Sequence, residues 1–380
     1  MKETTMQKEL AEAKALYLRC QLDRAFPIFL RCAQAGSGEA MYFLGEYYSQ
    51  GYGHVEQDTK RGAEWRKKGA MAGDVLAQLN TAYNLPPDHP GRTAIPKLVF
   101  PEILKRAEAG DVFAQNELPD MYFYGFGTEK DTGKAVEWLE RAGASGFWRP
   151  LNKLGEMYYY GEGIPADPKK AKAYFAKAAA LGYGDAEANL AMCWYAGPKK
   201  NMTRAVSLLR RAFAHGALFS KDIANLLGLF ILEGSGVPKD EKEAFEWMKR
   251  SAEMGSAEGM NHLAVFYERG IGTAPNEALA EEWCRKAADL GHADAAVQYG
   301  IYQREKGNNK AALRYFRQAA EQGNAHGQTW YASCFLFGIG AEEDRAEARK
   351  WLEKAAAQNE ENAVKLLKEE LGVDWPGPAK

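Results

Sequence analysis

Residues 254–288 read MGSAEGMNHLAVFYERGIGTAPNEALAEEWCRKAA, and this stretch decides the fold. Its first half places the small Ala264 and the aromatic Tyr267 at helical spacing, on one apolar face. A glycine pair beginning at Gly270 then ends that helix, because glycine tolerates the positive φ of a helix terminus. A second helix follows, with Trp283 one turn after an alanine. The stretch therefore predicts a helix–turn–helix hairpin.

The same hairpin pattern recurs along the chain of 380 residues. A glycine marks each repeat, at intervals of 32 to 39 residues, at Gly36, Gly73, Gly110, Gly146, Gly182, Gly216, Gly255, Gly291 and Gly323. This spacing is typical of helix-hairpin repeats and not of propeller blades or leucine-rich repeats, and nine marks predict about ten hairpins. The recurring G-x-G follows helices, whereas a dinucleotide fingerprint follows a strand and occurs once.

These motifs resemble the Sel-1-like repeat, a branch of the tetratricopeptide superfamily. Its pattern A-x-G-x-x-x-A-x-x-x-L-G-x-x-Y-x-x-G-x-G followed by K-A-x-x-W-x-x-K-A-A is met closely by segments 35–70, 109–142, 144–179, 254–288 and 322–356. The resemblance covers nearly the whole chain. Segments 180–212 and 290–320 lack the G-x-G, and segment 214–252 carries three extra residues in its first helix.

We therefore predict an all-α fold, a right-handed α-solenoid of about ten stacked helix-turn-helix repeats in a single domain over residues 1–380. Residues 35–356 hold the repeats. Residues 8–33 are expected to form an N-terminal capping hairpin and residues 359–371 a C-terminal capping helix, since a solenoid needs polar ends. The nine tryptophans, among them Trp247 and Trp283, are expected to be core residues, because they occur about once per repeat.

The least regular segment is the Pro-rich stretch 84–101, with Pro86, Pro87, Pro90, Pro96 and Pro101. Proline removes a backbone donor and disfavours helix before it, so an irregular loop is predicted here, with helix resuming near Glu102. One interpretation is a stiff connector in a degenerate repeat. The other is a protruding contact loop or hinge.

Composition excludes several classes of protein. With 49 basic and 51 acidic residues the formal net charge is −2, which gives no electrostatic footprint for nucleic acid. No apolar run approaches the roughly 20 residues of a membrane-spanning helix, so no membrane insertion is expected. The N-terminal sequence has no secretory signal pattern, and five cysteines without recurring spacing suit free thiols in a reducing compartment. A cytoplasmic location is expected.

Catalytic motifs are absent from the sequence pattern. The six histidines, His54, His89, His215, His262, His292 and His326, show no metal-ligand spacing, and no nucleophile has an adjacent base. Some cysteine-rich relatives of the family bind or hydrolyse β-lactams, but they carry paired cysteines in each repeat, which this chain lacks. We expect neither an enzyme nor a cofactor.

Two rows of polar residues are the candidate binding positions. In tetratricopeptide proteins the first helices line a concave groove, and the resemblance places at an inner position Asn116, Asn152, Asn225 and Asn261. Asparagine is a poor residue in mid-helix, so the recurrence needs a reason. The family resemblance implies that such asparagines hold an extended peptide. The alternative is a hydrogen bond to the neighbouring repeat.

A second row, three residues earlier, consists of Asp185, Asp222, Glu258 and Asp294, and a further inner position holds Glu46, Asp120 and Glu156. An acidic groove would take a partner with a Lys- or Arg-bearing segment. The alternative is that first-turn carboxylates simply complement the helix dipole and its unpaired amides.

The function expected from the resemblance is a protein–protein scaffold or adaptor, as in many bacterial relatives. The alternative is an immunity-type inhibitor that neutralises a cognate toxic effector by binding it. Consensus residues specify stacking, and only the variable inner positions specify the partner, so the sequence predicts protein binding without naming the partner.

Overall fold

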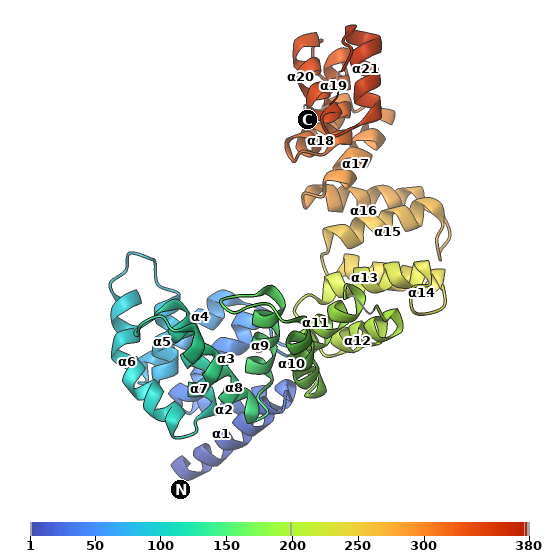
Figure 1. Ribbon diagram of the computed structural model, residues 1–380. Helices are drawn as coiled ribbons and strands as arrows, with labels where there is room; N and C mark the ends of the chain where they lie inside the picture. The colour runs from blue at the N-terminus through green and yellow to red at the C-terminus, as the bar shows by residue number, and fades with distance from the viewer. Residues whose placement is uncertain (1, 198–199, 376, 378–380) are drawn as a thin grey trace. The chain divides into compact units, whose positions relative to one another are not determined.

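The computed structural model describes residues 2–197, 200–375 and 377. Every regular element in this part of the chain is an α-helix, and consecutive helices pair into ten hairpins followed by a last single helix, as predicted (Figure 1). The helices are α1 (Lys2–Leu18), α2 (Leu22–Gln34), α3 (Gly38–Gln50), α4 (Thr59–Met71), α5 (Val75–Tyr83), α6 (Gly91–Glu108), α7 (Val112–Tyr124), α8 (Thr132–Ala144), α9 (Trp148–Tyr160), α10 (Pro168–Ala180), α11 (Gly184–Tyr195), α12 (Met202–Ala214), α13 (Ser220–Glu233), α14 (Glu241–Glu253), α15 (Ala257–Arg269), α16 (Glu277–Asp289), α17 (Ala293–Glu305), α18 (Asn309–Glu321), α19 (Ala325–Leu336), α20 (Arg345–Ala356) and α21 (Glu361–Leu371). None of these described helices is long and apolar enough to cross a membrane.

Local residues set the ends of the helices. The first helix of a regular hairpin ends on a left-handed glycine, such as Gly161 at φ 71° or Gly270 at φ 68°, where a side chain would be strained. The second helix begins at an Asp or Asn cap. The Asp167 carboxylate accepts from the amides of Lys169 and Lys170 at 3.0 Å. The turn between the two helices is therefore specified by the sequence itself.

A small residue lets the two helices of a hairpin approach closely. A β-carbon at Gly155 of α9 would lie 2.5 Å from the ring of Phe175 on α10, closer than real contacts allow. Gly300 of α17 faces Phe316 of α18 in the same way. The side chain of Phe175 is buried, as is that of Phe316. Contact between a small residue of the first helix and a large one of the second thus closes these hairpins.

The contacts within the chain group it into two compact units, Met1–Ser220 and Lys221–Lys380. Unit 1 contains α1 to α12, and unit 2 contains nearly all of α13 and the helices that follow it. The single-domain interpretation of residues 1–380 stays a prediction. In unit 2 the last helix, α21, covers the α19–α20 hairpin through Ala363 and Leu367, within the segment predicted as a cap.

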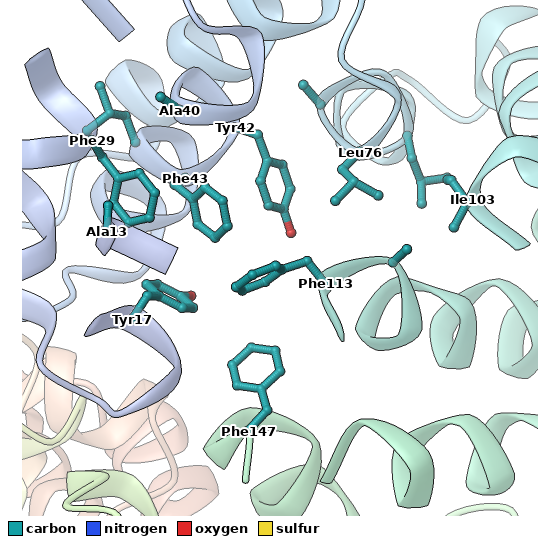
Figure 2. Packing of buried hydrophobic residues seen from close by; sticks show 14 of the residues in the cluster. Ala13, Tyr17, Phe29, Ala40, Tyr42, Phe43, Leu76, Ile103, Phe113 and Phe147 are labelled. Carbon is teal, nitrogen blue, oxygen red and sulfur yellow. The ribbon is translucent and has the colours of Figure 1, made fainter. Parts of the chain in front are cut away.

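Unit 1 is organised around an aromatic cluster that includes its first helix (Figure 2). The ring centroid of Tyr17 on α1 lies 5.2 Å from that of Phe43, 6.0 Å from Phe113 and 6.1 Å from Phe147. The Trp148 indole donates to the Tyr17 carbonyl at 3.0 Å. Helix α1 starts at Lys2, before the predicted capping hairpin 8–33, and it packs on α9 as well as on its sequence neighbour.

The predicted irregular loop at 84–101 is wrong over most of its length. Helix α6 begins at Gly91 and includes both Pro96 and Pro101, so only residues 84–90 connect α5 to α6. Proline inside a helix costs about 3 kcal/mol. Here Pro96, Val99 and Ile103 form a buried face against the neighbouring helices, and this tertiary packing outweighs the local penalty.

The tryptophan prediction is confirmed in part. The side chains of Trp138, Trp148 and Trp247 are buried, with Trp247 7% exposed. Trp283 is only half-buried, and the Lys286 ammonium lies 4.0 Å from its ring centroid. Half-buried tryptophans with a Lys or Arg over the ring also occur at Trp65, Trp194, Trp330 and Trp351. These rings cover the hairpin edge and are not core residues.

Alanine substitution should separate the two classes of tryptophan. We expect Trp247→Ala to lower the free energy of unfolding by about 3–5 kcal/mol, because it leaves a cavity. Trp283→Ala should cost about 1–2 kcal/mol, because solvent fills the space. Urea unfolding followed by circular dichroism measures both. Equal losses for the two variants would contradict this assignment.

Candidate functional site on the first-helix face

The eight residues that the sequence singles out lie on the first helices of their hairpins, all on the equivalent face of the helix. We define the first-helix face by the positions six and three residues before, and one and five residues after, the small residue of the hairpin. This spacing places the four positions along one side of a helix. The reference residues are Gly45, Ala82, Pro119, Gly155, Ala191, Gly228, Ala264, Gly300 and Ala332.

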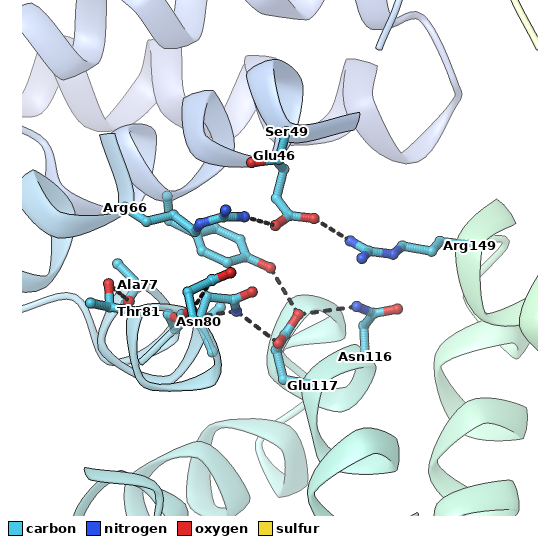
Figure 3. A network of polar contacts seen from close by, with 12 residues as sticks. Glu46, Ser49, Arg66, Ala77, Asn80, Thr81, Asn116, Glu117 and Arg149 are labelled. Carbon is cyan, nitrogen blue, oxygen red and sulfur yellow. Dashed lines mark hydrogen bonds and ion pairs between the residues drawn. The ribbon is translucent and has the colours of Figure 1, made fainter. Parts of the chain in front are cut away.

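In unit 1 a buried ion pair joins the first-helix faces of α3 and α9 (Figure 3). The Glu46 carboxylate is 3% exposed and lies 2.6 Å from Arg149 Nη1 of α9 and 3.4 Å from Arg66 Nη1 of α4. Glu46 and Arg149 are 103 residues apart in the chain. A buried carboxylate needs such partners, because removing one would leave an uncompensated charge. Part of this face in unit 1 is therefore occupied by the protein's own side chains.

Beside this pair lies Glu117, which sequence reasoning missed. Its carboxylate is 5% exposed and accepts from Tyr42 Oη at 2.9 Å, Asn80 Nδ2 at 2.9 Å and Asn116 Nδ2 at 3.2 Å. Burial raises the pKa of Glu117 to about 7, against an opposing effect of Arg149. The local sequence Gln115-Asn116-Glu117 is polar and gives no signal that the Glu117 carboxylate is buried.

The asparagine row is used mainly within the protein. Asn116 donates to Glu117, as above. Asn152, 7% exposed, donates to Glu156 Oε1 at 2.8 Å and accepts from Asn189 Nδ2 of the next hairpin at 3.1 Å. These contacts favour the inter-repeat interpretation for Asn152.

In unit 2 the two remaining asparagines differ. Asn225 Oδ1 lies 2.8 Å from His262 Nδ1 of the next hairpin, which is again an inter-repeat contact. The Asn261 side chain is half-buried and forms no hydrogen bond with the described part of the chain. Ligand contact by these asparagines stays a prediction.

The acidic row at the start of the first helices connects successive hairpins. Asp185 Oδ1 accepts from the Leu218 amide at 2.6 Å, and Asp294 Oδ1 accepts from Asn324 Nδ2 at 2.7 Å. In each case the donor lies at the start of the next hairpin. These carboxylates therefore do more than complement their own helix dipole.

Glu258 also contacts the next hairpin, in this case through a histidine. Its Oε2 lies 2.8 Å from His292 Nε2, and His292 caps α17, because its Nδ1 accepts from the Ala295 amide. Asp222, the fourth member of the row, is exposed. All four acidic residues occupy the equivalent position of their first helices. Three of them, Asp185, Glu258 and Asp294, contact the following repeat.

The solvent-facing part of the unit 1 face combines tyrosines with carboxylates. We call Asp120, Tyr124, Glu156 and Tyr160 the Tyr–acid surface. Tyr124 is 54% and Tyr160 74% exposed, Asp120 is exposed and Glu156 is half-buried. Loss of water around the two carboxylates raises the pKa of Asp120 and that of Glu156, although solvent still reaches both side chains. The repeat consensus requires no aromatic residue at the two tyrosine positions.

Cysteine, histidine and carboxylate meet at one place in unit 1. His215 Nδ1 lies 2.8 Å from Glu187 Oε2, and Glu187, which is fully buried, also pairs with Arg211. Cys20 lies nearby, with its Sγ 3.8 Å from the Gly182 carbonyl. Burial and the negative charge of Glu187 raise the pKa of Cys20 to about 12. A nucleophilic cysteine needs the opposite shift, so this arrangement is suited to packing and not to thiolate chemistry.

No group of three or more His, Cys, Asp or Glu side chains that could hold a metal ion occurs in residues 2–197, 200–375 and 377. The five cysteines are unpaired thiols.

The raised pKa of Glu117 predicts a pH effect on stability. The pKa of Glu117 is about 7 in the folded chain and near 4.5 in the unfolded chain. Between these two pH values the Glu117 carboxyl is therefore ionised mainly in the unfolded state. Stability should therefore fall as the pH rises from 4.5 to 7, by an amount on the order of 3 kcal/mol. Glu117→Gln should remove this fall. The measurement is the free energy of unfolding from pH 4.5 to 7. If it changes with pH equally in Glu117→Gln and the wild type, the assignment is wrong. Glu246→Gln, at an exposed position, is the control.

The thiols should react slowly in the folded protein. Burial raises the pKa of Cys20, Cys284 and Cys334 to about 12, and also raises that of Cys32 and Cys193, so little thiolate exists near neutral pH. Iodoacetamide labelling read by mass spectrometry should give little alkylation of the native chain and five labels after denaturation. Rapid labelling of native Cys20 would contradict the structural role given to it.

Comparison with known proteins identifies the repeat. The Sel1 repeat family model matches residues 38–74, 112–147, 151–183, 184–216, 224–256, 257–292, 293–324 and 325–360. The α5–α6 hairpin, with the prolines, lies outside these matches. No curated protein matches the chain in sequence.

Two solved structures, at 28% and 25% identity, agree with the family model. The protective antigen c5321 of uropathogenic Escherichia coli, described as having an SLR fold, is 28% identical with a TM-score of 0.64, over 98% of this chain and 83% of its own. A Sel1 repeat protein from Oxalobacter formigenes is 25% identical with a TM-score of 0.59, over 90% of this chain and 88% of its own. The immunity protein Pa5087 from Pseudomonas aeruginosa is 18% identical with a TM-score of 0.35, over 53% of this chain and 81% of its own. Since the family model matches most of the hairpins, the chain belongs to the Sel1 repeat family.

Proposed function

We propose that this chain is a protein-binding scaffold that holds its partner on the first-helix face. Sel1 repeat proteins generally mediate protein–protein interactions. The observation that supports a specific location is the pair Tyr124 and Tyr160, which are exposed at equivalent positions of adjacent first helices. Tyrosine supplies a large contact area with a polar tip and little conformational entropy, which is why it is enriched at interface hot spots.

The charge of the same surface supports a partner segment that bears Lys or Arg. Asp120 and Glu156 lie four residues before Tyr124 and Tyr160 on the same helix sides. The nearby Lys153 ammonium lies 3.2 Å from Glu162, so it already has a carboxylate partner. A cation from the partner would stabilise the ionised form of carboxylates that the protein partly desolvates. Aromatic contact would supply most of the affinity, and charge would supply orientation.

We further propose that the chain acts without catalysis and in the cytoplasm. Support for the first comes from the repeat family, and support for the second from five unpaired thiols, which suit a reducing compartment.

Affinity capture from native extract tests the proposed surface. We expect Tyr124→Ala with Tyr160→Ala to lower recovery of the main partner at least about tenfold, because two hot-spot side chains are lost. Asp120→Asn with Glu156→Gln should weaken binding less and reduce its salt dependence. Met71→Ala with Leu98→Ala is the matched control, since both residues are large, apolar and exposed but lie on second helices.

Equal recovery by the tyrosine variant and the control, with circular dichroism unchanged, would rule out this surface. The captured partner also separates the two roles. An effector whose toxic activity falls when bound indicates the inhibitor. A partner that is bound together with a further protein indicates the scaffold.

A further inference from the structure

The first-helix face of unit 2 has a chemistry of its own. Three consecutive first helices carry the same order of residues, an acid, then an uncharged residue, then an aliphatic one. These triplets are Asp222–Asn225–Leu229 on α13, Glu258–Asn261–Val265 on α15 and Asp294–Val297–Ile301 on α17. Within each triplet the spacing is i, i+3, i+7, so its members lie on one helix side.

The aliphatic row is not needed to close the hairpins. Leu229, Val265 and Ile301 are half-buried, one residue after the small residue. In unit 1 the same position holds the acids Glu46, Asp120 and Glu156 in three hairpins and Tyr83 and Met192 in the other two, so closing a hairpin does not require an aliphatic residue there. Three adjacent helices thus present apolar side chains where the repeat itself tolerates a carboxylate. Partly exposed apolar rows of this kind mark surfaces for partners.

The acidic row keeps its negative charge. None of Asp222, Glu258 and Asp294 forms an ion pair with a lysine or arginine of the described chain. Glu258 contacts two histidines: its Oε2 lies 2.8 Å from His292 Nε2, and its Oε1 lies 3.8 Å from His262 Nε2. Asp294 is bonded to the uncharged amide of Asn324. The contacts that connect the repeats therefore bring no lysine or arginine to the row.

The separation of the rows fits one kind of occupant. Seven residues of α-helix span about 10.5 Å, close to the roughly 10–12 Å diameter of a second helix. A helix lying across α13, α15 and α17 could place basic side chains on one flank and aliphatic ones on the other. An extended strand alternates its side chains between opposite faces and presents no two flanks at this distance.

We propose that this face of α13, α15 and α17 binds a basic amphipathic helix of a partner protein, with Lys or Arg toward Asp222, Glu258 and Asp294 and aliphatic residues toward Leu229, Val265 and Ile301. The half-buried Asn261 amide, unbonded within the described chain, lies between the two rows for a polar contact. The proposal rests on the proposed function only in assuming that the first-helix face binds proteins. It names a second site, separate from the Tyr–acid surface.

The probe is a fluorescein-labelled synthetic helix of about 20 residues, roughly 30 Å long, with leucine at heptad spacing and lysines along the neighbouring flank. Control probes are a scrambled peptide of the same composition and the same helix with glutamate for lysine. Fluorescence anisotropy with the full chain should show saturable, salt-sensitive binding of the basic amphipathic helix, at least about tenfold tighter than either control.

Matched variants locate the binding. Asp222→Lys should weaken the probe about tenfold, whereas Glu246→Lys, an equal charge change on the exposed side of α14, should not. Val265→Thr should weaken it several-fold, because it adds a hydroxyl to the apolar row without changing the volume much, whereas Val136→Thr on α8 should not. Melting curves confirm that each variant is folded.

The peptide experiment would overturn the proposal in either of two ways: binding of the basic helix no tighter than that of the scrambled peptide, or equal losses from Asp222→Lys and Glu246→Lys. Neither result touches the Tyr–acid surface, which is tested by capture with Tyr124 and Tyr160 variants. Conversely, loss of the capture result would leave the peptide result standing. A concentration-dependent increase in mass that the probe reverses would identify a second copy as the occupant and would also contradict a heterologous partner.

Discussion

The contact between a small residue of the first helix and a large side chain of the second is the constraint on which the structure depends. Gly155 against Phe175, Gly228 against Met248 and Gly300 against Phe316 leave no room for a β-carbon. Because this contact fixes the rotation of the first helix about its axis, it also fixes which positions point away from the hairpin. Recognition positions are therefore a geometric consequence of packing, repeated once per hairpin.

Those fixed positions are used differently along the chain. In unit 1 Tyr42 and Glu46 join an internal polar network with Glu117 and Arg149, so part of the face is buried by its own repeats. The remainder carries the exposed tyrosines. Within this network the Glu117 carboxylate has three donors, whereas the buried Arg66 Nε has no hydrogen-bond partner in the described chain. Because the internal network buries only one part of the face, the neighbouring positions can vary in sequence.

Local signals in the sequence predicted most of the fold and little of the site. Glycine marks, helix caps and small residues act within a few residues, and they gave the ten hairpins and the closing helix at 361–371. The helix through Pro96 and Pro101 was missed because tertiary packing, which local spacing does not record, outweighs the proline penalty. The Glu46–Arg149 pair was missed for the same reason, since its members are 103 residues apart. The asparagine and acidic rows recur at fixed spacing in the sequence, but their hydrogen bonds to the next hairpin depend on how the repeats stack.

The hydrogen-bond partners of the acidic row within the chain explain how one position can serve both repeat stacking and partner recognition. A lysine or arginine across the repeat boundary would join hairpins equally well but would cancel the charge that a partner reads. Here the His292 ring and the Asn324 amide hold the next hairpin, and neither contact uses a lysine or arginine. At the last boundary the arrangement is reversed, with His326 on the helix side and Glu360 as the cap, and here no further first helix continues the row. The acidic row can therefore join successive repeats without an arginine or lysine that would pair with its carboxylates.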